Sequence, residues 1–391
     1  MDNSVNTPHP HRKKILWGMT SLFLLIAFGV FLYWLLWGRF HQYTNDAYVS
    51  GNLVYVTPQV SSTATSIYVD DTQIVSQGDL LVELDPTDFQ IALNLSKAAL
   101  GTAIRDVAGL FLQSKQAAAL VEVAKADFFK TAEDFEKRRL LLDSGSVSTE
   151  DFDHAQSALI AAYFSLDAAE QNHFSLLSQI DQTTLQTHPR VQAKIEELKN
   201  AWVALSRCTL VAPVHGLVAQ RSVQVGQKVN PAEPLVAIIP LDQMWVDANF
   251  KEVQIGNMQI GQKAHITSDV YGTKVEYHGN LVGIGGGTGS VFSLLPPQNA
   301  TGNWIKIVQR VPVRIALDPS EIINHPLRLG LSMDVTIDIH DIGQSAIPSK
   351  TSCKPLYKTT IFNTEELGVE TIIEQIFKAN IPQFDLEMDL P

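Results

Sequence analysis

Two long stretches with heptad-spaced apolar residues constrain this fold more than any other feature of the sequence. In the first, residues 86–142, positions seven apart from Leu93 to Leu142 are apolar at seven of eight places. The second, residues 149–205, continues the pattern with an interruption at residues 187–190 and has the same length, 57 residues. Heptad spacing keeps one apolar stripe against a partner helix. The sequence therefore predicts an antiparallel coiled-coil hairpin over residues 86–205, about 85 Å long at ~1.5 Å per residue.

Both arms of this hairpin carry local signals for a helix start. Asp85 is placed to cap the first arm, with Pro86 at its first helical position. The polar run DSGSVS ends that arm, and Ser148 with Asp151 resembles a capping box that starts the second. His173 falls within the second apolar stripe, where we interpret it as a tolerated polar position rather than a ligand.

The segments on either side of the hairpin, residues 59–85 and 213–240, form an internal repeat. Both are rich in valine and leucine and have turn residues every few positions, which predicts short strands. They resemble the two halves of a biotinyl/lipoyl-type domain into which the hairpin is inserted. No attachment lysine stands at the tip, so a carrier function has no site. The aligned pairs are Val60 with Val214, at an offset of 154, and Ile74 with Val229 and Leu80 with Leu235, at an offset of 155. The two segments are therefore expected to repeat with a one-residue slip.

The remainder of the chain reads as a small β-barrel. Residues 331–340 alternate between apolar and polar side chains, and a second alternating run extends from Ile305 to Leu317. Further strands are expected at residues 245–250, 264–271 and 277–284, and residues 47–56 are expected to add one more. About six strands are enough to close a small barrel.

An uncharged apolar run, Ile15–Trp37, is 23 residues long, enough to span a membrane with some tilt. Arg12, Lys13 and Lys14 precede it, so the positive-inside rule keeps residues 1–14 in the cytoplasm and exports the rest of the chain. The alternative is a cleaved signal peptide. No small-residue cleavage site follows the run, which favours an uncleaved anchor.

Composition and motifs exclude several functions. The net charge of −12 disfavours nucleic acid as a partner, because the phosphate backbone would be repelled. Two cysteines, Cys208 and Cys353, are too few for a disulfide scaffold. The glycine-rich run GIGGGTG lacks the third glycine of a dinucleotide-binding loop, and the histidines show no metal-ligand spacing. We expect no enzyme activity, no metal and no cofactor.

The order anchor, half-domain, hairpin, half-domain and barrel resembles the membrane fusion (HlyD) family of periplasmic adaptors, and most closely its EmrA-type branch. The expected fold class is α+β: a single N-terminal transmembrane helix, a split lipoyl-like β domain with an inserted hairpin, and a small β-barrel. The matching runs are TNDAYVSG (44–51), LDPTD (84–88), MWVDANFKE (244–252), GTGSVFSLLP (287–296) and NATGNWIKIVQRVPVRI (299–315). The expected parts are 1–14 (cytoplasmic N-terminus), 15–37 (transmembrane anchor), 44–57 and 241–345 (barrel), 58–85 and 206–240 (lipoyl-like halves), 86–205 (hairpin) and 346–391 (tail).

The resemblance implies an adaptor subunit of a multidrug efflux pump in the inner membrane. It would link a major-facilitator (EmrB-type) drug/proton antiporter to a TolC-like outer-membrane channel, as a homo-oligomer. Adaptors that dock such channels often carry Arg, three residues, Leu, six residues and Ser at the hairpin tip. The matching positions here are Lys137, Leu141 and Ser148, with Arg138 beside the lysine. Lysine lacks the planar fork of arginine, which weakens the match.

Alternatives remain open at this stage. Leu141 could simply close the apolar seam and Ser148 could simply cap the second helix. An adaptor for an ABC-driven protein or peptide exporter is the second candidate function, and a membrane-anchored carrier or sensor is the third. In the tail, Asn363 with Glu366 is expected to cap a short amphipathic helix that packs on the barrel, packs on the transporter or stays mobile.

Overall fold

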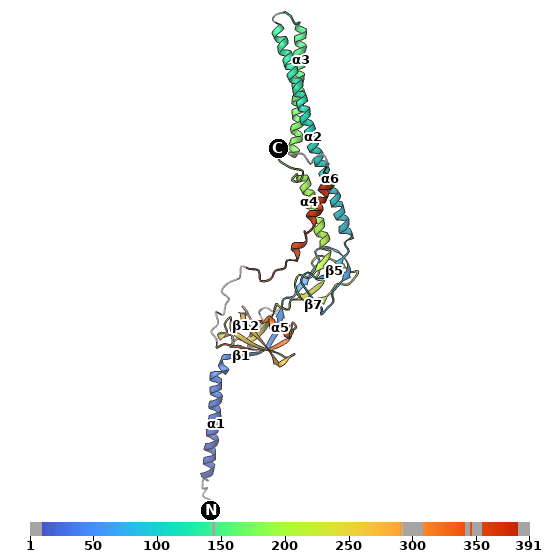
Figure 1. The fold of residues 1–391 in the computed structure, drawn as a ribbon. Coiled ribbons are helices and arrows are strands. Elements are labelled where there is room, and N and C mark those ends of the chain that lie inside the picture. The colour runs from blue at the N-terminus through green and yellow to red at the C-terminus, as the bar shows by residue number, and fades with distance from the viewer. Residues whose placement is uncertain are drawn as a thin grey trace, which may run out of the picture.

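The computed structural model describes residues 10–142, 145–289, 291, 308–340, 345 and 354–381. The molecule is long and narrow, with an N-terminal helix at one end, a helical hairpin at the other and two β structures between them (Figure 1). The arrangement confirms the predicted fold class.

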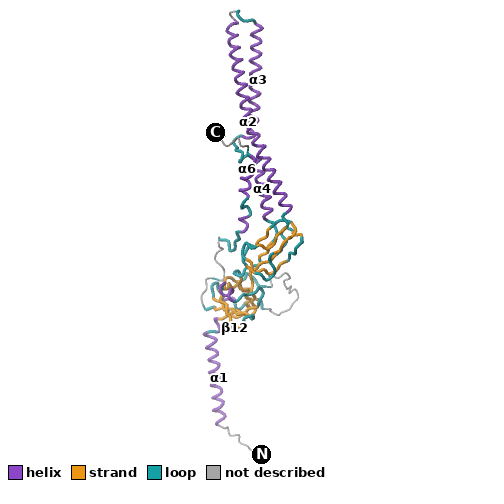
Figure 2. The backbone as a smooth tube through the Cα atoms, turned by 45° about the vertical axis from the view of Figure 1, so that its right-hand side comes forward, coloured by secondary structure: helices purple, strands orange, loops and turns teal. Residues whose placement is uncertain are grey.

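Helix α1 (Pro10–Leu36) stands clear of the rest of the chain (Figure 2). Its apolar side chains from Ile15 to Leu36 are largely exposed, which suits a lipid surround better than water. Among the described residues it is the one helix whose length and composition allow it to cross a membrane. A short 3₁₀ turn, η1 (Gly38–Phe40), leads directly into the first strand.

The hairpin is built from α2 (Thr87–Leu142) on one side and from α3 (Thr149–Ile180) and α4 (Pro189–Ser206) on the other. At ~1.5 Å per residue, the 56 residues of α2 are about 84 Å long. Asp85 accepts hydrogen bonds from the Thr87 backbone N–H at 3.0 Å and from the Thr87 hydroxyl at 2.6 Å. These bonds hold the pKa of Asp85 below its ordinary value. The predicted capping role of Asp85 is confirmed, and the helix begins at Thr87, one residue after the predicted Pro86.

The interruption of the second arm is organised by a buried histidine. His188, 4% exposed, caps α4 by accepting a hydrogen bond from the Arg190 backbone N–H at its Nδ1. Its Nε2 lies 3.0 Å from the carbonyl oxygen of Gln179, so the neutral ring donates there. One imidazole therefore ties the end of α3 to the start of α4, and the apolar seam continues across the break.

The lipoyl-like part consists of two four-stranded sheets that share one apolar core. The first sheet has the order β2 (Val54–Val56), β9 (Val236–Ile239), β7 (Gly216–Arg221), β4 (Ile74–Val75). The second has the order β6 (Thr209–Val211), β5 (Leu80–Leu84), β3 (Ser62–Ile67), β8 (Lys228–Val229). Each sheet contains strands from both sides of the hairpin, so neither half closes the core alone.

The two halves repeat at a constant offset of 154, and the one-residue slip expected from the sequence is wrong. Ile74 is 64% exposed, whereas its neighbour Val75 is 3% exposed and corresponds to the fully buried Val229. Likewise Leu81, not Leu80, corresponds to Leu235, since both are buried.

The turns of the two halves confirm this offset. Asp79 donates its backbone N–H to the carbonyl of Ser76, and Glu233 donates its own to the carbonyl of Asn230, each pair being 154 residues from the other. Gly78, with φ of +92°, matches Ala232, with φ of +70°. The repeat therefore keeps a left-handed turn conformation even where the second half has no glycine there.

The barrel is a closed, six-stranded structure with a continuous apolar interior. Its strand order is β1 (His41–Gly51), β10 (Met244–Lys251), β13 (Arg310–Leu317), β12 (Gly272–Ile284), β11 (Lys263–Ser268), β14 (Ser332–Asp338), with β14 returning to β1. The turn η2 (Ile255–Asn257) and the short helix α5 (Pro319–Asn324) lie between strands.

Two features of the barrel differ from the expectation or lie beyond it. Residues 44–57 were expected to belong to it as a whole, but β2 pairs with β9 of the lipoyl-like part instead. The predicted alternation from Ile305 to Leu317 is confirmed from residue 310 onward. Ile305 and most of the runs GTGSVFSLLP and NATGNWIKIVQRVPVRI lie outside the described residues, as does Cys353.

The tail forms η3 (Ile361–Thr364) and α6 (Val369–Asn380). The predicted apolar face is confirmed, with Val369, Ile373 and Phe377 buried. The predicted cap is wrong: α6 begins after Gly368, not at Asn363. The face does not pack on the barrel; it joins the core between α2 and α4 at the base of the hairpin (Figure 2).

Candidate functional site

The free end of the hairpin carries the residues singled out as partner-binding. Gly145, with φ of +72°, lies in the turn, and its backbone N–H bonds to the carbonyl of Leu142. Residues 143 and 144 lie outside the described part of the chain. The turn joins α2 to α3 at the point farthest from α1 (Figure 1).

Leu141 lies on the surface of the tip rather than in the seam. Its exposed fraction is 46%, and that of the preceding Leu140 is 71%. Leu142, the heptad position, is the half-buried one. The idea that Leu141 merely closes the seam is therefore wrong, because two adjacent leucines at the end of the rod remain in water. Exposed apolar side chains in such a place are typical of a contact surface.

Arg138 joins the two arms of the hairpin. Its Nη1 donates to the carbonyl oxygen of Asp151 in α3 at 3.1 Å, and its Nη2 lies 3.1 Å from an Asp134 carboxylate oxygen on its own helix. One guanidinium thus spans two elements, using the fixed fork of donors that arginine provides. Arg138 therefore helps to hold α2 and α3 together at the tip.

Lys137 points its charge into solvent beside its own helix. Its Nζ is 2.6 Å from the Glu133 carboxylate, and both side chains are about two-thirds exposed, at 67% and 69%. The hydrogen bond that Lys137 donates to Glu133 raises the pKa of Lys137 and lowers that of Glu133. An exposed pair of this kind contributes little to stability. The ammonium can therefore change partner at small cost.

Ser148 caps α3, as the sequence predicted. Its Oγ accepts a hydrogen bond from the Asp151 backbone N–H at 3.1 Å and donates to the Asp151 carboxylate at 2.7 Å. The hydroxyl is thus engaged within the hairpin. The capping interpretation is confirmed.

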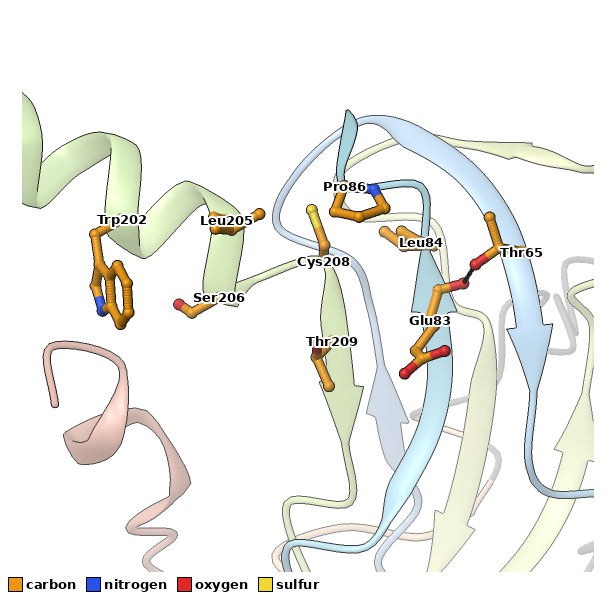
Figure 3. A pocket seen from close by; sticks show the side chains of 9 residues that line it. All are labelled: Thr65, Glu83, Leu84, Pro86, Trp202, Leu205, Ser206, Cys208 and Thr209. Atoms are coloured by element: carbon orange, nitrogen blue, oxygen red, sulfur yellow. Dashed lines mark hydrogen bonds between the residues drawn. The ribbon is translucent and has the colours of Figure 1, made fainter. Parts of the chain in front are cut away.

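A second feature is a hollow of about 390 Å³ where the hairpin meets the lipoyl-like sheets. Figure 3 shows Trp202 and Leu205 of α4 on one side and Glu83 and Leu84 of β5 on the other. The Trp202 indole N–H donates to the carbonyl of Glu365 at 3.0 Å, so the tail segment before α6 is bonded to this junction. The Glu365 carboxylate also pairs with Arg207 at 3.1 Å.

Cys208, at the wall of this hollow, is expected to be an inert thiol. It is 3% exposed, and burial raises its pKa to about 11. Since the thiolate is the reactive form, near pH 8 it should be ~100-fold less abundant than for a thiol of ordinary pKa. In a Cys353→Ser background, a maleimide should label the folded protein at least that much more slowly than the protein in denaturant. Equal labelling rates would contradict the burial of this side chain.

The barrel surface holds a group of residues that the sequence analysis missed. His265 on β11 and Glu276 and His278 on β12 each offer one ligand atom, and these atoms lie within 4.8 Å of one another. No spacing motif in the sequence indicates that these three residues form a site. They could be found only by folding β11 and β12 about the turn at residues 269–271, which places residues 265 and 278 opposite each other.

Known proteins are similar to this chain over most of its length. The family model described as "EMRA, alpha-helical hairpin domain" matches residues 87–208. The chain is 42% identical over 354 residues to the multidrug export protein EmrA of Escherichia coli (strain K12), covering 90% of this chain and 91% of that protein. The chain belongs to the EmrA family of membrane fusion proteins. With α1 near the N-terminus, membership of this family makes it a single-pass, membrane-anchored adaptor.

Two further comparisons each cover about three quarters or more of this chain. The chain is 41% identical to the fatty acid resistance protein FarA of Neisseria gonorrhoeae, covering 93% of each chain. A solved structure titled "Structure of the periplasmic adaptor protein EmrA" aligns with 76% of this chain and 98% of that chain, at 18% identity and a TM-score of 0.38.

Proposed function

We propose that this chain is the periplasmic adaptor of a tripartite multidrug efflux pump. In this proposal α1 anchors it beside a major-facilitator drug/proton antiporter of the inner membrane, and the hairpin tip docks onto a TolC-like outer-membrane channel. The observation that carries the proposal is Leu141: an exposed leucine at the far end of a rod about 84 Å long, next to Lys137. The names of the relatives, a multidrug export protein and resistance proteins, support the same function.

The proposed orientation places the N-terminus in the cytoplasm. Arg12, Lys13 and Lys14 lie on the N-terminal side of the apolar run, and Arg39 follows it. This excess of cations favours retention of the short N-terminal segment on the cytoplasmic side. The hairpin, on the other side, would then project away from the inner membrane.

The proposed homo-oligomer is supported by apolar side chains that the hairpin itself leaves in water. One hairpin cannot enclose a conduit, so several copies packed side by side are needed. Large apolar residues on the outer faces of α2 and α3 would lie between the copies. They include Leu120, Val123, Phe129, Phe164 and Phe174, each more than half exposed.

The function as proposed needs no catalytic residue or cofactor from this chain. The antiporter would supply the energy, and the adaptor would supply contacts and length. The relatives are adaptor proteins rather than enzymes, which supports a role in assembly rather than chemistry.

Site-specific photocrosslinking in living cells tests this proposal. A photoreactive amino acid at position 141 should crosslink to an outer-membrane channel, and one at the exposed Val270 of the barrel should not. A third probe at Phe129, on α2 but 12 residues below Leu141, should crosslink to other copies of the chain instead. Mass spectrometry of the crosslinked products would identify each partner.

Two results would overturn the proposal. If position 141 gives no channel adduct in cells whose pump is active, the tip does not dock there. If the inner-membrane partner recovered with the adaptor is an ATPase-linked exporter, the alternative of an ABC-driven secretion system replaces the antiporter.

A further inference from the structure

Two histidines face each other across neighbouring strands on the outside of the barrel. His265 of β11 and His278 of β12 are directly paired in the antiparallel register. Their rings meet edge to face, with centroids 5.4 Å apart. Both side chains are about half exposed, at 47% and 57%, so an ion from solvent can reach them.

A carboxylate completes this cluster. Glu276 lies two residues before His278, on the same face of β12, and its Oε1 is 2.7 Å from His265 Nδ1. One nitrogen from each ring and one oxygen of Glu276 lie within 4.8 Å of one another. Three ligands about 2.0–2.2 Å from a common zinc ion would lie somewhat closer together than this. Small side-chain rotations would be enough to close that gap, and all three side chains have room to make them.

A second carboxylate orients His278. Glu321 of α5 is 27% exposed, and its Oε1 lies 2.8 Å from His278 Nδ1. Its Oε2 accepts the backbone N–H of His278. In the neutral ring the Nδ1 hydrogen then points at Glu321, and the Nε2 lone pair is left for a ligand. Metal-binding histidines commonly have their second nitrogen held by a carboxylate in this way.

The local charge favours a cation. The carboxylates of Glu276, Glu321 and Asp318 surround the two rings. Among the described residues no lysine or arginine forms an ion pair with any of these three carboxylates. The site therefore has negative charge to offset and two nitrogen donors to bind with.

We propose that His265, Glu276 and His278 bind one divalent transition-metal ion of the Zn²⁺ type on the barrel surface, with Glu321 as the positioning residue for His278. Two imidazoles and one carboxylate suit zinc and leave a fourth position for water or for a ligand from a partner. The site would bridge β11, β12 and α5. It is independent of the proposed efflux function.

Zinc titration of the untagged full-length protein in detergent tests this proposal. Competition against a chromogenic chelator should give one tight site per chain. His278→Gln should weaken that site by more than the ~10–100-fold typical of an outer-shell change. His215→Gln, an exposed histidine of the lipoyl-like part, is the matched control and should bind like the parent protein. The parent protein and all variants should carry His9→Gln and His11→Gln, so that these two N-terminal histidines cannot bind zinc.

Glu321→Gln separates a metal site from a simple group of ion pairs. It should retain one zinc per chain with ~10–100-fold weaker affinity, because glutamine still accepts a hydrogen bond but without charge. Glu276→Gln provides a second test of the ligand set should His278→Gln fail to fold. The proposal is overturned if the parent protein binds no zinc tightly, or if folded His278→Gln and Glu276→Gln bind it like the control.

Discussion

In the proposed pump, replacing Leu141 with aspartate is expected to abolish drug resistance, while the hairpin stays folded. Leu141 is 46% exposed and lies outside the seam, so the substitution removes little core packing. At a docking surface, the same change buries an unpaired charge against an apolar pocket. Central apolar contacts of an interface cost about 2 kcal/mol or more when lost, which is about 30-fold in affinity.

Growth in the presence of a hydrophobic uncoupler would measure this effect, with immunoblots to confirm the amount of adaptor. Leu356→Asp is the matched control, since this leucine is 83% exposed and belongs to the tail segment rather than the tip. It should leave resistance unchanged. Wild-type resistance in the Leu141→Asp strain would mean that Leu141 is not an anchor of the docking contact.

The starts of α2 and α3 were predictable from the sequence because the bonds that make them are local. Asp85 caps α2 through a residue two positions away, and Ser148 caps α3 through a residue three positions away. The anchor helix and the hairpin were predictable for a related reason, since their apolar periodicity is a property of one segment at a time.

The offset of the repeat was not predictable from hydrophobicity alone. Ile74 and Val75 are adjacent and equally apolar, yet only Val75 enters the core. A strand alternates its faces at each residue, so a choice between two apolar neighbours decides which side is buried. The pairing of β2 with β9 joins strands about 180 residues apart, and no local pattern in the sequence predicts that pairing.

The candidate sites also contain some residues that a local sequence pattern indicates and others that only the tertiary fold brings together. The sequence placed Lys137, Leu141 and Ser148 at the tip, and its heptad spacing placed Leu142 rather than Leu141 in the seam, as the structure has it. His265 and His278 were overlooked because their proximity depends on the register of β11 against β12. The orienting carboxylate comes from α5, a short helix that no periodicity predicts.

Of the substitutions considered for this protein, Phe250→Ala is expected to lower the free energy of unfolding the most. Phe250 is fully buried in β10 and lies opposite Val311 of β13, inside the closed barrel. Removing a buried phenylalanine ring costs about 3–5 kcal/mol, because apolar contacts are lost and a cavity remains. A barrel of six strands has no spare element to collapse into that space, since each strand is already paired on both sides.

Phe362→Ala makes the same chemical change in the tail turn η3, where the side chain is 52% exposed. Its cost should be within about 0.5 kcal/mol, as for ordinary surface substitutions. Hydrogen exchange of the full chain in detergent distinguishes the two, because it reports each element separately. In Phe250→Ala the amides of β10 and β13 should exchange faster while those of α2 keep their protection. Faster exchange throughout the chain would instead mean that barrel and hairpin unfold as one unit, which the separate apolar cores of the two parts argue against.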